Sequence, residues 1–217
     1  MTDYKTRRTM MVDTQVRPSD VTKFPIIAAM LDIEREEYVP AALRPAAYLD
    51  GNLELGEGRV LLEPRTMGKL LDALDIHTDD LILDVGCALG YSAALLARLG
   101  GTVVAVESDE AIAEEAQRKL SENGFDNAAV VAAPLEQGAA KHGPYDVIVI
   151  EGGIEILPQT IANQLKEGGR IAALFMDGAL GEVRIGVKRG DNVDWRRAFN
   201  AAAPVLPGFE QVVEFSL

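Results

Sequence analysis

The residues with the clearest chemical potential lie in one segment, where a strand, a turn and a helix are predicted in succession. The run LDVGCALGY at positions 83–91 passes from an apolar stretch through Gly86 and Gly90 into a helical pattern. Glycine lets the backbone approach a ligand closely and take a positive φ, and a helix N-terminus offers free N–H donors. Glu107 ends the next predicted strand about 20 residues later, where a carboxylate can accept hydrogen bonds from both hydroxyls of a ribose. The two features together predict a site for a nucleoside-containing ligand at the carboxyl edge of a parallel sheet.

The composition of this turn discriminates between two classes of nucleoside ligand. A dinucleotide site requires the pattern Gly-x-Gly-x-x-Gly, but here Ala88 stands at the middle position and the third glycine is absent. Asp84 places a carboxylate beside the ligand, which suits an ammonium and a sulfonium group better than phosphates. The segment therefore favours S-adenosyl-L-methionine as the cofactor, and a nicotinamide-dependent dehydrogenase is the least favoured enzyme class.

From residue 64 onward, the elements that must position these side chains alternate regularly. Apolar runs bounded by turn residues predict strands at 81–85, 102–106, 128–132, 145–150 and 170–175. Helical patterns fall between and before them, at 64–74, 91–99, 109–124 and 158–165. This alternation predicts an α/β fold with a doubly wound, mostly parallel Rossmann-like sheet.

Both ends of the chain depart from this alternation. Residues 183–188 and 193–199 flank a polar turn and predict an antiparallel hairpin, and 211–215 predicts a closing strand. Before residue 64, short helical patterns at 9–16, 21–31 and 43–49 precede two short extended runs. We expect a helical cap with a short hairpin over 1–63, too small for a core of its own, and a cofactor-binding core over 64–217.

Composition excludes several classes of function. With 34 acidic against 21 basic residues, the net charge is −13, which disfavours nucleic acids and anionic membranes as partners. No apolar stretch has the length of a membrane span or signal peptide, so the sequence predicts a cytoplasmic protein. The single cysteine, Cys87, and two isolated histidines, His77 and His142, offer no metal-binding pattern.

Several motifs in the same order and spacing resemble those of the protein-L-isoaspartate O-methyltransferase family of class I methyltransferases. The run at 83–91 resembles motif I of that family, and the segments REEYVP at 35–40, AYLD at 47–50, PYDVI at 144–148 and 157–170 also match. The resemblance implies methyl transfer from S-adenosyl-L-methionine to carboxylates of damaged aspartyl residues in proteins. It implies that the cofactor is held by Asp84, Gly86, Cys87, Ala88, Gly90, Tyr91, Glu107, Ser108 and Leu135.

The sequence departs from the family pattern at two functional places. Leu62 stands where the family has a serine whose hydroxyl assists methyl transfer, and leucine neither donates nor accepts a hydrogen bond. Residues 133–135, Ala-Pro-Leu, stand where the family has a Gly-Asp-Gly that contacts adenine. Glu63 and Glu151 remain as weak candidates for a catalytic role, Glu63 beside the lost hydroxyl and Glu151 as a base at a strand end.

These departures leave three functions open. The first is the isoaspartyl methyltransferase, because a direct displacement can draw much of its rate from positioning alone. The second is a non-catalytic cofactor-binding or protein-interaction module of the same fold, which Leu62 and Pro134 favour. The third is a methyltransferase with another acceptor, such as a small carboxylic acid. The expected partners are therefore isoaspartyl proteins or peptides, or a small carboxylic acid, and the sequence gives no indication of the oligomeric state.

Overall fold

The computed structural model describes residues 3–56 and 58–211 of the chain. The helices are α1 (Tyr4–Met11), α2 (Phe24–Asp32), α3 (Pro64–Leu74), α4 (Tyr91–Leu99), α5 (Glu110–Glu122) and α6 (Gln159–Ala162). The strands are β1 (Leu53–Gly56), β2 (Arg59–Leu61), β3 (Leu81–Val85), β4 (Thr102–Glu107), β5 (Ala128–Ala132), β6 (Tyr145–Ile154), β7 (Leu165–Asp177), β8 (Leu180–Arg189) and β9 (Asn192–Asn200). A π-helical turn at Val12–Val16 continues α1, and short 3-10 turns occupy 17–19, 35–38, 41–46, 135–137 and 140–142.

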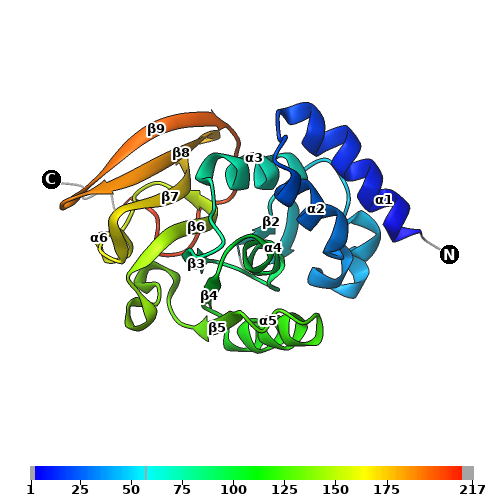
Figure 1. Cartoon of the computed structure of the whole chain (residues 1–217), viewed down its shortest axis with the longest axis horizontal. Coiled ribbons are helices and arrows are strands. Elements are labelled where there is room, and N and C mark those ends of the chain that lie inside the picture. Colours follow the sequence, from blue (N-terminus) through cyan, green and yellow to red (C-terminus); the bar gives the residue numbers. More distant parts are fainter. Residues whose placement is uncertain (1–2, 57, 212–217) are drawn as a thin grey trace, which may run out of the picture.

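Within the described residues, seven strands form one sheet in the order β5-β4-β3-β6-β7-β8-β9. Its first five strands are parallel, and β7, β8 and β9 pair in antiparallel fashion. Figure 1 shows α1 and α2 at one end of the molecule and the β8–β9 hairpin at the other. The α/β fold with a mostly parallel sheet and terminal antiparallel strands is confirmed.

Alternate residues of each strand face opposite sides of the sheet, so the core has two parts. Ile82 of β3 packs in a cluster with α3, α4 and the N-terminal helices, whereas Leu83 and Val85 pack in a second cluster with Leu206 and Phe209. Residues before and after position 64 share the first cluster, for example Met30 and Leu96. The boundary between 1–63 and 64–217 stays a prediction.

The helix predicted over 158–165 and the strand predicted over 145–150 have different bounds in the structure. The helix predicted over 158–165 ends at Ala162, and the Gly168-Gly169 pair predicted to end it lies inside β7, which begins at Leu165 because that residue pairs with Tyr145. The fourth parallel strand runs to Ile154, which places Glu151 inside β6 and not in a loop after it. The closing strand predicted at 211–215 lies outside the described residues beyond Gln211.

Candidate functional site

The predicted glycine turn forms as expected between β3 and α4. Gly86 and Gly90 have φ of +83° and +94°, and Ala88, at the position of a middle glycine, also takes a positive φ of +46°. The N–H groups of Gly86 and Cys87 donate to the Val106 carbonyl of β4 at 2.8 and 3.2 Å. These bonds bring the turn to the end of β4, where the sequence placed the ribose-binding acid.

Glu107 lies beside the turn, but its carboxylate is already fully bonded. The side chain is completely buried and accepts hydrogen bonds from the backbone N–H of Ala88 at 3.1 Å and of Ser108 at 2.7 Å. Arg59 of β2 also donates to it, from Nε at 3.0 Å and from Nη2 at 2.9 Å. Burial alone would raise the pKa of Glu107, but the hydrogen bonds and charge of Arg59 hold that pKa below its ordinary value.

Two other buried carboxyl groups lie at the same edge of the sheet. Asp84 Oδ2 accepts a hydrogen bond of 2.7 Å from Ser92 Oγ, while Asp84 Oδ1 and Glu151 Oε1 have no hydrogen-bond partner among the described residues. Burial raises the pKa of Asp84 to about 7, with the Ser92 hydrogen bond opposing and the Glu107 charge adding to the shift. Burial and the charge of Asp84 also raise the pKa of Glu151. Unpaired, desolvated oxygens of this kind are typical of functional sites.

Tyr91, the first residue of α4, packs against two buried polar side chains, Arg35 and Tyr38. Arg35, fully buried, lies 4.9 Å from the centroid of the Tyr91 ring and donates to the carbonyls of Ala47 and Leu62, both at 2.7 Å. Tyr38 also packs against Tyr91, with its ring centroid 5.9 Å from that of Tyr91. The resemblance of the segment at 35–40 to the family gives Arg35 no role, and its hydrogen bond to the Leu62 carbonyl follows only from the tertiary structure.

The space above the turn is filled by the C-terminal part of the chain. Leu206 is fully buried, and a Cβ placed on Gly86 would lie 3.3 Å from its Cδ1. A Cβ on Gly152 would lie only 2.6 Å from Leu206 Cδ2, so this leucine rests directly on two glycines of the sheet edge. Leu135, predicted to contact the cofactor, is also buried and lies 3.7 Å from the same Gly86 position. No sequence pattern indicated Leu206.

Beside Leu135 a surface pocket of about 620 Å³ remains open. It is lined by Ser108, Glu110, residues 132–136, Pro207 and Gly208. The pocket therefore includes Ser108, Pro134 and Leu135, which the resemblance places at the adenine end of the cofactor. Positions 133–135 of this lining are Ala, Pro and Leu, so they offer no aspartate to an adenine.

The two catalytic candidates have different surroundings. Glu63 precedes α3 and accepts hydrogen bonds from Thr66 Oγ1 at 2.5 Å and Arg65 Nη1 at 3.3 Å, so its carboxylate is engaged in local contacts at the helix start. Leu62 is buried beside it. Glu151, in contrast, is buried with a free oxygen among the acids described above. The geometry favours Glu151 over Glu63 as a group that meets a ligand.

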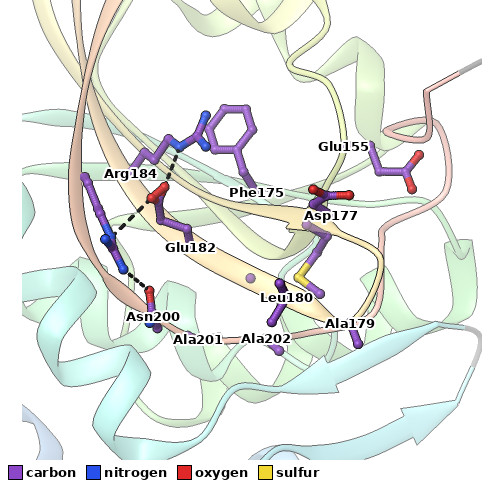
Figure 2. A pocket seen from close by; sticks show the side chains of 13 residues that line it. Glu155, Phe175, Asp177, Ala179, Leu180, Glu182, Arg184, Asn200, Ala201 and Ala202 are labelled. Atoms are coloured by element: carbon purple, nitrogen blue, oxygen red, sulfur yellow. Dashed lines mark hydrogen bonds and ion pairs between the residues drawn. The ribbon is translucent and has the colours of Figure 1, made fainter.

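Two further features of the surface involve none of the residues predicted to hold the cofactor. A pocket of about 710 Å³, shown in Figure 2, is lined by the β7–β8 turn and by residues 200–202, with Glu182 paired to Arg184 and Arg197. None of the predicted site residues lines it.

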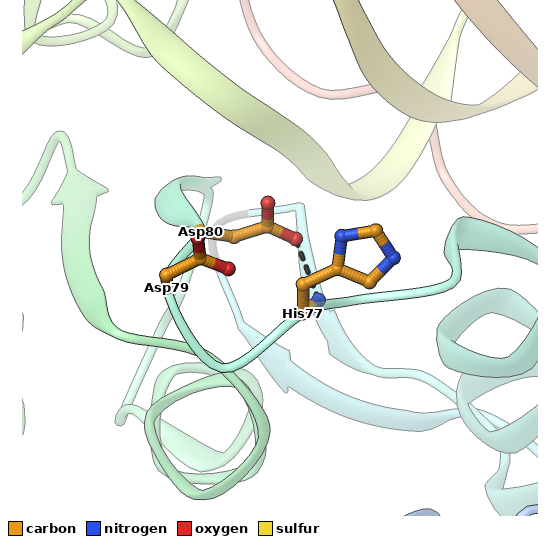
Figure 3. Close-up of side chains that lie close together, drawn as sticks. All are labelled: His77, Asp79 and Asp80. Carbon is orange, nitrogen blue, oxygen red and sulfur yellow. Dashed lines mark hydrogen bonds between the residues drawn. The ribbon is translucent and has the colours of Figure 1, made fainter.

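His77 and Asp79 lie near Asp80 in the turn before β3 (Figure 3). The Asp80 carboxylate accepts a hydrogen bond of 2.7 Å from the His77 backbone N–H and pairs with Arg170. These contacts show that Asp80 stabilises the turn, and the His77 side chain is exposed.

Comparison with known proteins decides which family this arrangement represents. The family described as Protein-L-isoaspartate(D-aspartate) O-methyltransferase (PCMT) matches residues 7–189. The chain belongs to the protein-L-isoaspartate O-methyltransferase family. The enzyme of that name from Methanoculleus marisnigri is 36% identical over 166 residues, which are 76% of this chain and 76% of the relative. A second, from Pelobacter propionicus, is 30% identical over 190 residues, covering 88% of this chain and 84% of the relative.

Solved structures agree with this assignment. A protein-L-isoaspartate O-methyltransferase superposes with a TM-score of 0.80 at 25% identity, covering 93% of this chain and 66% of that one. A structure from Plasmodium falciparum, described as the same enzyme in complex with S-adenosyl-L-homocysteine, has a TM-score of 0.78. It covers 95% of this chain and 99% of that one, and at 15% identity it supports the fold alone. The family resemblance is confirmed, and with it the class of enzyme and the S-adenosyl-L-methionine cofactor of the family.

The residues of this chain fit an S-adenosyl ligand unevenly. At one end, the free Asp84 Oδ1 suits an ammonium donor, and the two-glycine turn allows close approach. At the nucleoside end, the Glu107 carboxylate can accept hydrogen bonds from ribose hydroxyls. However, Arg59 already donates hydrogen bonds to both of its oxygens, and Leu206 covers the turn. The roles of the predicted site residues therefore remain proposals.

The described part of the chain contains no helix that is both long and apolar enough to cross a membrane.

Proposed function

We propose that this protein transfers the methyl group of S-adenosyl-L-methionine to the carboxylate of L-isoaspartyl residues in damaged proteins and peptides. The observation that carries the proposal is the meeting of Asp84, Gly86 and Glu107 at the carboxyl edge of β3 and β4, in a chain of this family. When bound, the cofactor supplies an electrophilic methyl group on its sulfonium. In this assignment Asp84 orients the ammonium of the cofactor, the turn at 86–90 supports its body and Glu107 receives its ribose.

Glu151 takes the place of the missing serine hydroxyl in this proposal. Burial and the charge of Asp84 raise the pKa of Glu151, which favours the neutral carboxyl form, and that form can donate an O–H hydrogen bond. A neutral acid does not repel an anionic acceptor, and a donor at this position orients the acceptor carboxylate for displacement. Leu62 contributes only apolar surface that excludes water.

An assay with a synthetic isoaspartyl peptide and labelled S-adenosyl-L-methionine tests the activity directly. The same peptide with a normal aspartyl residue is the matched control. Methyl transfer to the isoaspartyl peptide alone supports the proposal, whereas binding of the cofactor without transfer to any carboxylate contradicts it and supports the non-catalytic module. Transfer to small carboxylic acids instead of the peptide would identify the third function.

Two variants test the role of Glu151. Glu151→Gln keeps a hydrogen-bond donor and is expected to retain most of the activity, whereas Glu151→Leu is expected to lower kcat/KM by about tenfold or more because a hydrogen bond to a charged acceptor is lost. The isoaspartyl assay measures both, with Glu63→Gln as the same substitution at the other candidate. Equal activity of the Leu and Gln variants would exclude Glu151 as a donor.

The non-catalytic module has its own structural support. Leu62 removes the family hydroxyl, and Arg59 and Leu206 fill space that a ligand of the turn would need.

The cytoplasmic location also stays a proposal, supported by Cys87, which is a free, buried thiol of the kind found in reducing compartments.

A further inference from the structure

The contact between Arg59 and Glu107 joins two parts of the molecule that are distant in sequence. Arg59 comes from the short β1–β2 hairpin and Glu107 from the end of β4, 48 residues later. Both side chains are buried, at 4% and 0% exposure, and the guanidinium donates to both carboxylate oxygens. Arg59 Nη2 also donates to Ser108 Oγ at 2.7 Å, so the guanidinium is anchored at two adjacent residues.

The hydrogen-bonding capacity of Glu107 is used up in this arrangement. A carboxylate offers about four lone-pair positions. Oε2 accepts from Arg59 Nε and the Ala88 N–H, while Oε1 accepts from Arg59 Nη2 and the N–H groups of Ser108 and Asp109. Two ribose hydroxyls can donate hydrogen bonds to this carboxylate only if the hydrogen bonds from Arg59 to Glu107 break.

A second contact fills the neighbouring space from the other end of the chain. Leu206 lies on Gly86 and Gly152 and is held by backbone bonds, since its N–H donates to the Gly153 carbonyl at 2.9 Å and the Gly153 N–H donates to the Pro204 carbonyl at 2.8 Å. Residues 203–209 therefore run along the end of β6 as a strap over the turn. Phe209, fully buried, anchors the far end of this strap in the second core cluster.

We propose that Arg59 is an internal competitor for the ribose position of the cofactor site, and that Arg59 with Leu206 sets the affinity of the protein for S-adenosyl ligands. The inference rests on the proposed use of S-adenosyl-L-methionine. A ligand binds when Arg59 leaves Glu107 and Leu206 leaves the glycines, so the apparent affinity equals the intrinsic affinity multiplied by the fraction of open molecules. Breaking a buried bidentate pair is costly, which keeps that fraction small.

Calorimetric titration of the full chain with S-adenosyl-L-homocysteine tests this competition. Arg59→Gln keeps one donor for Glu107 but cannot form the bidentate pair, and it is expected to bind about ten to a hundred times more tightly than the unmodified protein. Leu206→Ala removes the apolar cover by an independent change and is expected to tighten binding in the same direction. Arg118→Gln makes the same charge change at an exposed ion pair of α5 and is expected to bind like the unmodified protein.

Thermal unfolding without and with the ligand gives a second readout that does not depend on turnover. Arg59→Gln is expected to melt at a lower temperature without ligand and to gain more from the ligand than the unmodified protein does, because its site is open. If Arg59→Gln does not fold, the Leu206→Ala titration decides alone.

The outcomes separate this inference from the proposed function. Equal affinity of the unmodified protein, Arg59→Gln and Leu206→Ala would overturn the competition and leave the cofactor assignment intact. Absence of binding in every variant at millimolar ligand would overturn both. Tighter binding of Arg59→Gln, with Arg118→Gln unchanged, supports the inference, and tighter binding of Leu206→Ala alone would leave Leu206 and not Arg59 as the group that limits affinity.

Discussion

Asp84 and Glu107 end neighbouring parallel strands, yet their pKa values are displaced in opposite directions. Asp84 is buried with one oxygen unpaired and has its pKa raised to about 7, whereas Arg59 and nearby N–H groups hold the pKa of Glu107 below its ordinary value. The difference arises from the partners of each carboxylate, since both are buried. The sequence placed both acids at the site, and only the contacts determine which one is paired.

The raised pKa of Asp84 predicts a pH dependence of stability. Between the ordinary carboxyl pKa of 3.8 and about 7, the folded protein binds more protons than the unfolded chain. The free energy of unfolding is therefore expected to fall as the pH rises through this window, by roughly 1 kcal/mol per pH unit at most for such a group. Glu151 adds to the same trend, because its pKa is also raised.

Urea unfolding at about pH 5 and pH 7 measures this trend. Asp84→Asn keeps an acceptor for Ser92 but cannot ionise, and it is expected to flatten the dependence. Glu114→Gln is the comparison, because it removes one exposed carboxylate of α5 and leaves the buried acids unchanged. An unchanged slope in Asp84→Asn would contradict the assignment.

At the scale of elements, the site depends on where β3, β4 and α5 begin and end. Apolar periodicity predicted both strands and the start of α5 to within a residue, because strand and helix patterns and caps are encoded in short windows. The prediction was wrong for α6 and the start of β7, where pairing of Leu165 with Tyr145 extends the strand. Tertiary pairing there outweighs the local helical preference.

The N-cap of α5 gives a prediction for this scale. Asp109 accepts a hydrogen bond of 2.9 Å from the Ile112 N–H, and its own N–H donates to Glu107. Asp109→Ala is expected to lower the free energy of unfolding by about 1 kcal/mol, and Asp109→Asn by much less, since asparagine also caps helices. Urea unfolding measures both. Glu114→Ala, in the middle of the same helix, controls for loss of one charge, and a loss as large as that of Asp109→Ala would contradict the capping role.

At the scale of the whole molecule, three distant parts of the chain converge on one edge of the sheet. The β1–β2 hairpin contributes Arg59, the 3-10 turn at 35–38 contributes Arg35, and the strap at 203–209 contributes Leu206. All three lie near the turn between β3 and α4. The N-terminal segment and the C-terminal strap are thus parts of the site.

Arg35 tests this long-range organisation. Its guanidinium donates to the carbonyls of Ala47 and Leu62, so Arg35→Met leaves two buried acceptors without a donor. The free energy of unfolding is expected to fall by about 2–4 kcal/mol. Arg118→Met, at an exposed position, is expected to change it by less than about 0.5 kcal/mol in the same urea titration. A similar effect of the two substitutions would show that the Arg35 hydrogen bonds to Ala47 and Leu62 do not stabilise the N-terminal segment.

The sequence by itself determined the α/β alternation, the two-glycine turn, the acids Asp84 and Glu107 that flank it, and the family. Each of these is written in a window of a few residues or in the order of such windows, which is why reading along the chain recovers them. Only the tertiary structure decided that Arg59 forms an ion pair with Glu107 and that Leu206 covers the turn. It also decided that Glu151 Oε1 has no hydrogen-bond partner among the described residues. Those facts depend on packing between segments separated by 48 residues or more, as for Arg59 and Glu107, and no local pattern carries that information.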